Sequence, residues 1–272
     1  MVPSSGDSLR ENKPLVDFFG VSIIDESDSN FLERIVSEKR KEKSINIMAL
    51  NLTSLERFTQ EMYSFSKIFE YTVADGNGLV RMSRYVKRNI VNQISLSTLS
   101  EKILKKSCCN GKKVFLLGAT KKINLLAVAN VKTKYPGIRI FGHHGYFDEN
   151  NMDAIINVIN VYAPDFIFVG ISSPKKERVM LKISKSYTNS INIAVGGFID
   201  ILAGKTKRAP RLIQKCSLEW VYRFFQEPKR MFFPMIHGGF FFLFKIFPQM
   251  RKEAKKEFPS TLDIIIRSCL GK

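Results

Sequence analysis

Residues 113–141, KVFLLGATKKINLLAVANVKTKYPGIRIF, contain the pattern that decides the fold class. The apolar run over 113–117 predicts a buried strand, and the turn Gly118-Ala119-Thr120 follows it. A helical pattern and the turn Pro136-Gly137 then lead to a second strand-like run at 138–141. Strand, helix and strand in this order form one βαβ unit of the size expected in a doubly wound sheet.

The same order of strand, polar turn and helix repeats along the chain. Further buried strands are predicted for the apolar runs at 44–50, 68–73, 165–171 and 191–195. Helices are predicted near 30–41, from 79 onward, over 92–106 and over 152–162. A short strand pair or entry segment over 15–24 comes first. The sequence therefore predicts an α/β protein with a mainly parallel sheet and flanking helices.

Length and charge bound the domain organisation and the partners. The 272 residues suffice for one large α/β domain with an appendage, which we place at 15–203 and 204–272 after a flexible leader at 1–14. The net charge of +18 indicates nucleic acid, an anionic membrane surface or phosphorylated substrates as partners. Since no nucleic-acid-binding motif is present, we expect no nucleic-acid partner. Stronger salt-dependent retention on DNA than on anionic liposomes would contradict this expectation.

The cysteine pattern and the N-terminal sequence predict a compartment. The four cysteines, at 108, 109, 216 and 269, form no C-x-x-C pair, and the chain has only three histidines. This pattern predicts reduced thiols and no metal site. The polar N-terminus has no apolar core of a signal peptide, and the run MFFPMIHGGFFFLFKIF at 231–247 is too short and interrupted to span a bilayer. We expect a cytoplasmic protein.

Polar residues collect where the predicted strands end. These tips are Asn51, Asp75, Gly118 to Thr120, Gly145, Lys175 to Glu177 and Gly196 to Asp200. Parallel strands end at one edge of the sheet, where ligands of such proteins bind, so we expect the tips to lie together. A lone carboxylate among amides and cations suits general-base activation of a hydroxyl near a phosphate leaving group. Spacing alone thus predicts an enzyme or binder of phosphorylated small molecules.

Several tips also have a structural interpretation. Asp75-Gly76 could form a hairpin or a helix cap, and Thr53-x-x-Glu56 matches a capping box. His143-His144 on a glycine loop fits a structural turn as well as a catalytic or metal-binding pair. The basic stretch from Ala194 to Arg230 could approach phosphate or form a strand end and a solvated helix. The residues alone leave these alternatives open.

A set of short motifs, in order from Phe19 to Arg230, resembles the bacterial WecB/TagA/CpsF glycosyltransferase family, glycosyltransferase family 26. The motifs are Phe19-Gly20-Val21-x-Ile23-x-Asp25, Ala74-Asp75-Gly76-x-Gly78, His144-Gly145-Tyr146-Phe147, Pro174-Lys175-x-Glu177, Gly196-Gly197-Phe198-x-Asp200, Ala203-Gly204, Arg208-Ala209-Pro210, Leu218-Glu219-Trp220-x-Tyr222-Arg223 and Glu227-Pro228-x-Arg230. Each motif is weak alone, but their joint occurrence in order is specific.

The resemblance implies a Rossmann-like catalytic domain and an inverting transfer from a UDP-sugar to a polyprenyl-diphosphate-linked sugar. The sugar would be a hexose or an N-acetylhexosamine, of the N-acetylmannosamine or glucose type, and the products would serve surface polysaccharide synthesis. It implies no cofactor and no metal, with Asp75 as the catalytic base. The implied donor-binding residues are Asn51, Gly76, Asn77, Gly118, Ala119, Thr120, Gly145, Tyr146, Pro174, Lys176, Glu177, Gly196, Gly197 and Asp200. The implied acceptor-diphosphate residues are Arg208, Arg223 and Arg230.

Three positions depart from the family pattern. Ala49-Leu50-Asn51 stands where the family often has Thr-x-Asn, and Lys176 stands where it often has glutamine. Phe232-Phe233 follows Arg230 where the family often continues with arginine. Lys176 could neutralise a diphosphate or an acidic sugar, so the donor sugar stays open. The alternative function is a catalytically weakened member of the family that binds nucleotide-sugar or lipid.

The C-terminal tail combines aromatic and basic residues. They are Phe232, Phe233, Phe240, Phe241, Phe242, Leu243, Phe244 and Phe247, with Lys245, Arg251, Lys252, Lys255 and Lys256. Such a segment suits an anchor in the headgroup region of an anionic membrane, although a buried C-terminal helix is the alternative. We therefore expect a peripheral protein on the inner face of the cytoplasmic membrane. The exposed apolar tail could also drive assembly into a homo-oligomer, and the sequence leaves the oligomeric state open.

Overall fold

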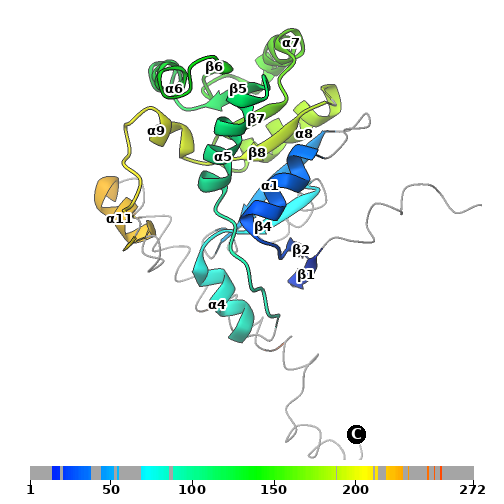
Figure 1. The fold of residues 1–272 in the computed structure, drawn as a ribbon, viewed down its shortest axis with the longest axis vertical. Helices are drawn as coiled ribbons and strands as arrows, with labels where there is room; N and C mark the ends of the chain where they lie inside the picture. Colours follow the sequence, from blue (N-terminus) through cyan, green and yellow to red (C-terminus); the bar gives the residue numbers. More distant parts are fainter. Residues whose placement is uncertain are drawn as a thin grey trace, which may run out of the picture.

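An eight-stranded, mainly parallel sheet with helices on both faces forms the centre of the computed structural model (Figure 1). The structure describes residues 14–18, 21–37, 44–51, 54, 69–85, 88–187, 189–210, 212–213 and 219–228, and the single residues 232, 244, 248 and 252. The α/β fold predicted from the sequence is confirmed.

The strands follow the order β1-β2-β4-β3-β8-β7-β5-β6 across the sheet. They are β1 (Leu15–Phe18), β2 (Val21–Ile24), β3 (Ile45–Leu50), β4 (Tyr71–Ala74), β5 (Lys113–Gly118), β6 (Arg139–His143), β7 (Phe166–Gly170) and β8 (Ile191–Ala194). β1 pairs antiparallel with β2, and every other pairing in the sheet is parallel. All the strands from β2 to β8 therefore end at the same edge, called the carboxyl edge below.

Most of the described helices flank the sheet, and α11 (Glu219–Gln226) lies to one side of it (Figure 1). The others are α1 (Asp28–Ser37), α4 (Asn77–Tyr85), α5 (Leu96–Cys109), α6 (Lys121–Lys134), α7 (Met152–Tyr162), α8 (Lys175–Ser186) and α9 (Phe198–Leu202), with a short 3-10 turn at Glu149–Asn151. The apolar sides of α1, α5, α6 and α9 share one buried cluster, whereas those of α7 and α8 share another. Residues of β5 alternate between the two clusters, as expected for a strand buried on both faces.

The largest departure from the sequence prediction is the start of α5. A helix was predicted over 92–106, but α5 begins at Leu96. The preceding residues are not helical, because they bond to distant parts of the chain: the backbone N–H of Asn92 donates to Asp25, and that of Ile94 donates to Ala74. Contacts far apart in sequence thus override the local helical pattern.

Glycines allow β5 and β7 to meet closely at the carboxyl edge. A Cβ atom on Gly118 would lie 2.4 Å from the carbonyl oxygen of Gly170, and the φ of Gly118 is +154°. The chain leaves β5 into α6 on one face of the sheet and leaves β7 into α8 on the other. Neighbouring strands whose connections diverge in this way open a crevice at their carboxyl ends, where ligands of doubly wound sheets bind.

We predict that Gly118→Ala destabilises the protein by about 2 kcal/mol more than Gly137→Ala does, because the new methyl group would overlap the backbone of β7. Gly137 is the matched control: its φ is also positive, at +86°, but a Cβ there would meet nothing within 4 Å. Urea denaturation of both variants measures the difference. Equal losses would mean that backbone strain, and not the contact with β7, governs Gly118.

Candidate active site

Asn51 and Asp75 lie side by side at the carboxyl edge. β3 and β4 pair in register, with Leu50 opposite Ala74 at the end of each strand. The backbone N–H of Asp75 donates to the carbonyl oxygen of Leu50 at 2.9 Å, which continues the pairing past the strand ends. Both Asn51 and Asp75 are half-buried. The structure therefore brings these two predicted site residues together.

A turn built by Asn51 follows β3. The side-chain oxygen of Asn51 accepts the backbone N–H of Ser54 at 2.8 Å, and the hydroxyl of Ser54 accepts the backbone N–H of Asn51 at 2.8 Å. This reciprocal pair satisfies the backbone where the chain enters the next segment. Thr53 and Glu56, the predicted capping box, lie outside the described residues.

Asp75 lies two residues before the start of α4 at Asn77. Gly76 has a φ of +99° and its carbonyl oxygen accepts the backbone N–H of Leu79 at 3.2 Å. β4 pairs only with parallel neighbours, so the hairpin interpretation of Asp75-Gly76 is wrong and the helix start is correct. Since the N-terminus of a helix carries partial positive charge, this place stabilises a carboxylate.

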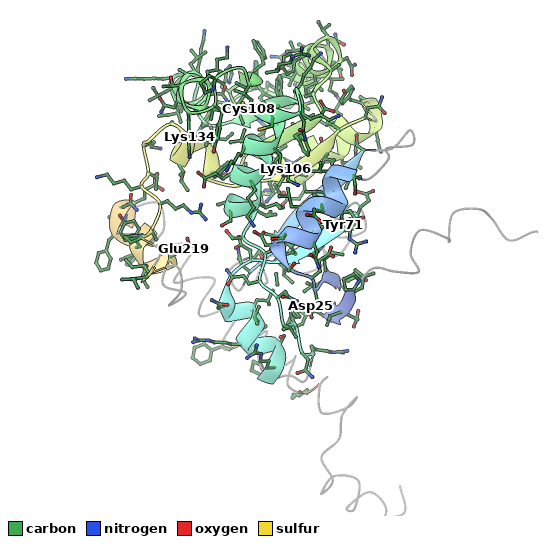
Figure 2. The ribbon with its side chains drawn as sticks, viewed as in Figure 1. Asp25, Tyr71, Lys106, Cys108, Lys134 and Glu219 are labelled. Carbon is green, nitrogen blue, oxygen red and sulfur yellow. The ribbon has the colours of Figure 1, made fainter. Side chains whose placement is uncertain are left out.

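The carboxylate of Asp25 holds the segment that joins α4 to α5 (Figure 2). It accepts the backbone N–H groups of Val91 and Asn92 and the side-chain amide of Asn92, at 3.1, 2.7 and 3.0 Å. Ile94 then donates its backbone N–H to Ala74 at 2.9 Å, next to Asp75. The sequence motif contained Asp25 but gave no sign of this structural role.

The turn after β5 and the turn after β6 form a second group of tips. Ala119 has a φ of +56°, and Thr120 caps α6 by accepting the backbone N–H of Ile123 at 3.4 Å. The backbone N–H of Gly145 donates to the carbonyl oxygen of Ala119 at 2.9 Å, so the two turns are joined. Tyr146, the next residue, is 75% exposed. A capped helix N-terminus beside glycine-rich turns is suited to bind an anion.

The first turn of α6 carries Lys121 and Lys122, both exposed, and no acidic residue. Positive side chains are unfavourable at a helix N-terminus, where Asp and Glu are usually preferred. An anion bound at this end would offset the repulsion. These lysines are not among the predicted site residues, although two cations directly after the turn Gly118-Ala119-Thr120 are a signal that could have identified them.

The tip of β7 contains a buried carboxylate. Glu177 is 1% exposed; its Oε1 accepts the hydroxyl of Ser173 at 2.7 Å and lies 3.2 Å from the ammonium of Lys176. Its Oε2 is buried without a hydrogen-bond partner among the residues that the structure describes. Lys175 contacts a different part of the chain: its ammonium donates to the carbonyl oxygen of Phe147 and lies 4.0 Å from the ring centre of the same residue. These contacts connect the start of α8 to the turn after β6.

Asp200, predicted as a donor-binding residue, is engaged within the chain. Its carboxylate lies 3.1 Å from the ammonium of Lys205, which lies 3.8 Å from Glu227. The side-chain amide of Gln226 bonds both the N–H and the C=O of Lys207, at 2.7 and 2.9 Å. These contacts connect α9 to α11. Gly196, with a φ of +54°, and Gly197 form the tip of β8 itself.

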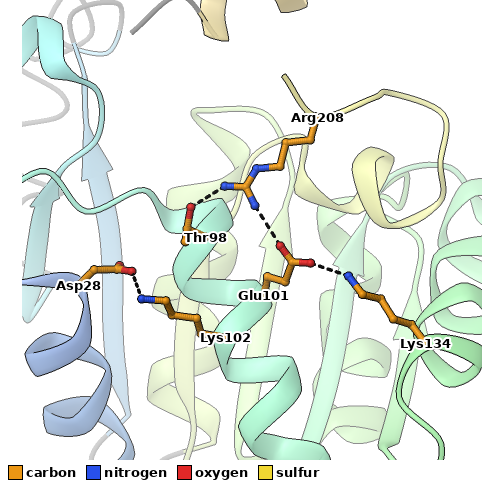
Figure 3. Close-up of polar contacts among 6 residues, drawn as sticks. All are labelled: Asp28, Thr98, Glu101, Lys102, Lys134 and Arg208. Carbon is orange, nitrogen blue, oxygen red and sulfur yellow. Dashed lines mark hydrogen bonds and ion pairs between the residues drawn. The ribbon is translucent and has the colours of Figure 1, made fainter. Parts of the chain in front are cut away.

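Arg208, predicted to meet the acceptor diphosphate, belongs to a network on α5 (Figure 3). Its guanidinium donates to the hydroxyl of Thr98 and lies 3.0 Å from Glu101, whose other oxygen lies 2.5 Å from Lys134. Its Nε is buried and has no hydrogen-bond partner among the described residues. The side chain of Arg223, in α11, and the whole of Arg230 lie outside the described residues.

His143 and His144 contact each other where β6 ends. Their rings stack with centres 4.4 Å apart, and Nδ1 of His143 bonds the carbonyl oxygen of His144 at 2.8 Å. Burial, followed by the neighbouring His143 and Lys121, lowers the pKa of His144. In the part of the chain that the structure describes, no group of three or more His, Cys, Asp or Glu side chains could hold a metal ion.

Fold and site together define a doubly wound α/β protein that carries a carboxylate–amide pair and a helix N-terminus on one edge of its sheet. The chain belongs to the Glycosyl transferase WecG/TagA/CpsF family, whose model matches residues 16–256. The family predicted from the motifs is thereby confirmed, and the protein is a glycosyltransferase.

Similar proteins carry a specific name. N-acetylglucosaminyldiphosphoundecaprenol N-acetyl-beta-D-mannosaminyltransferases of Staphylococcus aureus strains MW2, MRSA252 and NCTC 8325 / PS 47 are each 29% identical to this chain over 226 residues. The match covers 82% of this chain and 89% of each relative. The name of these relatives gives a polyprenyl-diphosphate-linked sugar as their acceptor.

The network around Glu101 predicts a pH-dependent contribution to stability. The hydrogen bond from Lys134 holds the pKa of Glu101 below its usual value, against the opposing effect of burial. A depressed folded-state pKa stabilises the protein above the unfolded pKa of about 4.3, and this stabilisation is lost as the pH falls through the folded-state pKa. Because Glu101 is 38% exposed, solvent screens the pair, and we expect Glu101→Gln to lower stability at pH 7 by at most about 1 kcal/mol.

Chemical denaturation at a series of pH values tests this expectation, with the exposed Glu33→Gln on α1 as the matched control. The difference between wild type and Glu101→Gln should shrink below about pH 4 and in high salt. A difference independent of pH would show that the carboxylate contributes through packing and not through its charge.

Proposed function

We propose that this glycosyltransferase moves a hexose or N-acetylhexosamine from a UDP-sugar to a polyprenyl-diphosphate-linked sugar, with inversion, in surface polysaccharide synthesis. The observation that carries the proposal is the placement of Asp75 beside Asn51 on the edge that also bears the N-terminus of α6. The acceptor named for the Staphylococcus aureus relatives supports the choice of substrate class.

The spacing of the strands indicates where the two ends of the UDP-sugar would lie along the carboxyl edge. Parallel strands lie about 4.8 Å apart, so β5, four strands from β4, ends about 19 Å from the strand that bears Asp75. The anomeric carbon must lie within a few ångströms of the acceptor hydroxyl and its base, so it cannot sit at β5. We therefore assign the nucleoside and its first phosphate to the tips of β5, β6 and β7, and the second phosphate and the sugar to the edge nearer Asn51, Gly196 and Gly197.

In the proposed reaction Asp75 takes the proton of the acceptor hydroxyl as its oxygen forms a bond to the anomeric carbon. The bond from that carbon to the diphosphate oxygen breaks on the opposite face, and UDP leaves with the electron pair. Backbone N–H groups at the strand tips stabilise the charge that develops on the diphosphate. No cofactor or metal is part of the proposal.

The ion pair of Lys176 with Glu177 bears on the donor. Because Glu177 neutralises this ammonium, Lys176 does not present an isolated positive charge to the substrate. The unpartnered Oε2 of Glu177 is an acceptor that a hydroxyl or N–H group of the nucleotide-sugar would satisfy. This arrangement favours recognition of an uncharged hydroxyl or N–H group of the nucleotide at the tip of β7.

The appendage after Ala203 supports the proposal of a peripheral membrane protein on the cytoplasmic side. Leu212 and Phe225 are each 76% exposed, and Phe244 is 70% exposed. Within the described residues, the helices are all too short or too polar to cross a bilayer. Exposed aromatic residues next to a basic tail suit the headgroup region, where a polyprenyl-linked acceptor is presented. Self-association stays a prediction.

We predict that Asp75→Asn lowers turnover by at least about a hundredfold while the protein stays folded, because the amide cannot accept the proton. The assay measures transfer from a panel of labelled UDP-sugars to short-chain polyprenyl-diphosphate-sugars with varied first sugars. Asp153→Asn, the same change on an exposed carboxylate of α7, is the matched control and should keep full activity.

The outcomes separate the two functions considered. Product from one donor, abolished by Asp75→Asn alone, supports the transferase reaction and identifies the sugar. UDP-sugar binding without product from any combination of donor and acceptor would instead favour a catalytically weakened member of the family. Ala49, in place of the family's threonine, would then be the first position to test. Absence of UDP-sugar binding would overturn the donor site itself.

We predict that Phe225→Ser weakens binding to vesicles containing anionic lipid by about tenfold, because burying a phenylalanine contributes about 1.5–3 kcal/mol. Val161→Ser is the matched control, since Val161 is 87% exposed but lies on α7, outside the appendage. Co-sedimentation measures binding. Equal losses in the two variants, or none in either, would contradict membrane docking through α11.

A further inference from the structure

We propose that Asn124 is a positioning residue for nucleotide binding, because its buried side-chain amide holds the turns after β5 and β6 in one fixed arrangement. The inference rests on the proposed function, which assigns the nucleotide to these turns. Asn124 is not part of any sequence motif considered above, and it lies in the first half of α6, behind the turn that it controls.

The contacts of Asn124 converge on the ends of two strands. Its side-chain N–H groups donate to the carbonyl oxygens of Leu116 and Gly118 on β5, at 3.1 and 3.0 Å, and to that of His143 on β6, at 3.0 Å. The residue is 2% exposed, and its own backbone N–H donates to the carbonyl oxygen of Thr120 at 2.8 Å. The side-chain amide thus connects β5 and β6 to the first turns of α6, on which Asn124 lies.

These carbonyl groups need such a donor. The register of β5 and β6 ends with Leu117 opposite His143, so the carbonyl groups of Gly118 and His143 lie where this ladder ends, whereas that of Leu116 lies within it. A buried carbonyl group without a partner costs about 1–3 kcal/mol. A carboxamide supplies two N–H donors in a rigid plane, which a hydroxyl group cannot do.

The neighbouring residue on β6 is adapted to this amide. A Cβ atom on Gly142 would lie 2.2 Å from the side-chain oxygen of Asn124. Only glycine leaves room for the amide in the position that allows its N–H groups to reach both strands. Gly142 and Asn124 therefore form one structural unit.

The turn held by this unit is strained. Ala119 has a φ of +56°, in the left-handed region that residues other than glycine rarely occupy. Such a conformation persists only where the surroundings fix it. Asn124 fixes the residue before Ala119, and the N–H of Gly145 fixes its carbonyl oxygen. Without the amide, the turn should relax and the N–H groups at the start of α6 should lose their alignment with a ligand.

A second buried asparagine provides a matched control. Asn192 on β8 is 0% exposed and donates its side-chain amide to the side-chain oxygen of Asn46 at 2.9 Å. This pair lies near the start of β3 and β8, at the opposite edge of the sheet from the tips. Replacing Asn192 also removes a buried amide hydrogen bond from the core, but it leaves both turns intact.

The experiment compares Asn124→Leu with Asn192→Leu by UDP titration calorimetry and by hydrogen exchange of peptides covering 116–124 and 142–147. We expect both variants to lower Tm, but only Asn124→Leu to raise the Kd for UDP by about tenfold or more and to speed exchange at the two turns. Similar losses of UDP affinity in both variants would reduce Asn124 to a stabilising core residue and overturn the inference.

Asn124→Asp keeps the inference testable if the leucine variant does not fold. Aspartate has the same shape but offers oxygen atoms to the carbonyl groups, so the same changes in Kd and exchange are expected. Wild-type UDP binding that neither Asn124 variant alters would overturn this inference and leave the proposed function standing. A wild-type protein that does not bind UDP would overturn both.

Discussion

The in-register parallel pairing of the sheet is the constraint on which the site depends. Because neighbouring strands from β2 to β8 run the same way, their last residues meet along one edge, and each strand contributes a turn there. Asn51 and Asp75 are adjacent only because Leu50 pairs with Ala74. A shift by one residue would move every side chain of a strand to the other face and separate this pair. The register of the strands therefore determines which side chains meet at the candidate active site as well as which are buried in the core.

The sequence predicts the strands well because the central ones are buried on both faces. Continuous apolar runs such as the one in β7 have few alternatives once polar turns bound them. Prediction failed where distant residues decide the local structure. The segment before α5 has a helical pattern, but hydrogen bonds to Asp25 and Ala74 keep it out of the helix, and no local signal reports a partner as distant along the chain as Asp25.

The tips of the site could be predicted, whereas the contacts of their charged residues could not. Strand ends and turn residues identify Asn51, Asp75 and the turn after β5 from the sequence alone. Whether a charged residue meets a ligand or another side chain depends on its neighbours in space. Asp200 pairs with Lys205, and Arg208 is held by Glu101 and Thr98. The resemblance to the family implied that both bind a ligand, and the structure shows their contacts within the chain.

The net charge of +18 has a structural explanation in part. The last turns of α5, α6 and α8 contain lysines, among them Lys106 and Lys134 (Figure 2). These helix ends lie at the edge of the sheet opposite to the site, since the helices run antiparallel to the strands that follow or precede them. Positive side chains there complement the helix dipoles.

The cations at the tip of β7, Lys175 and Lys176, are engaged by carbonyl or carboxylate groups. Attraction of an anionic substrate to the strand tips therefore depends on oriented backbone N–H groups and on the exposed Lys121 and Lys122 at the start of α6, so the geometry of the turns matters as well as the overall charge.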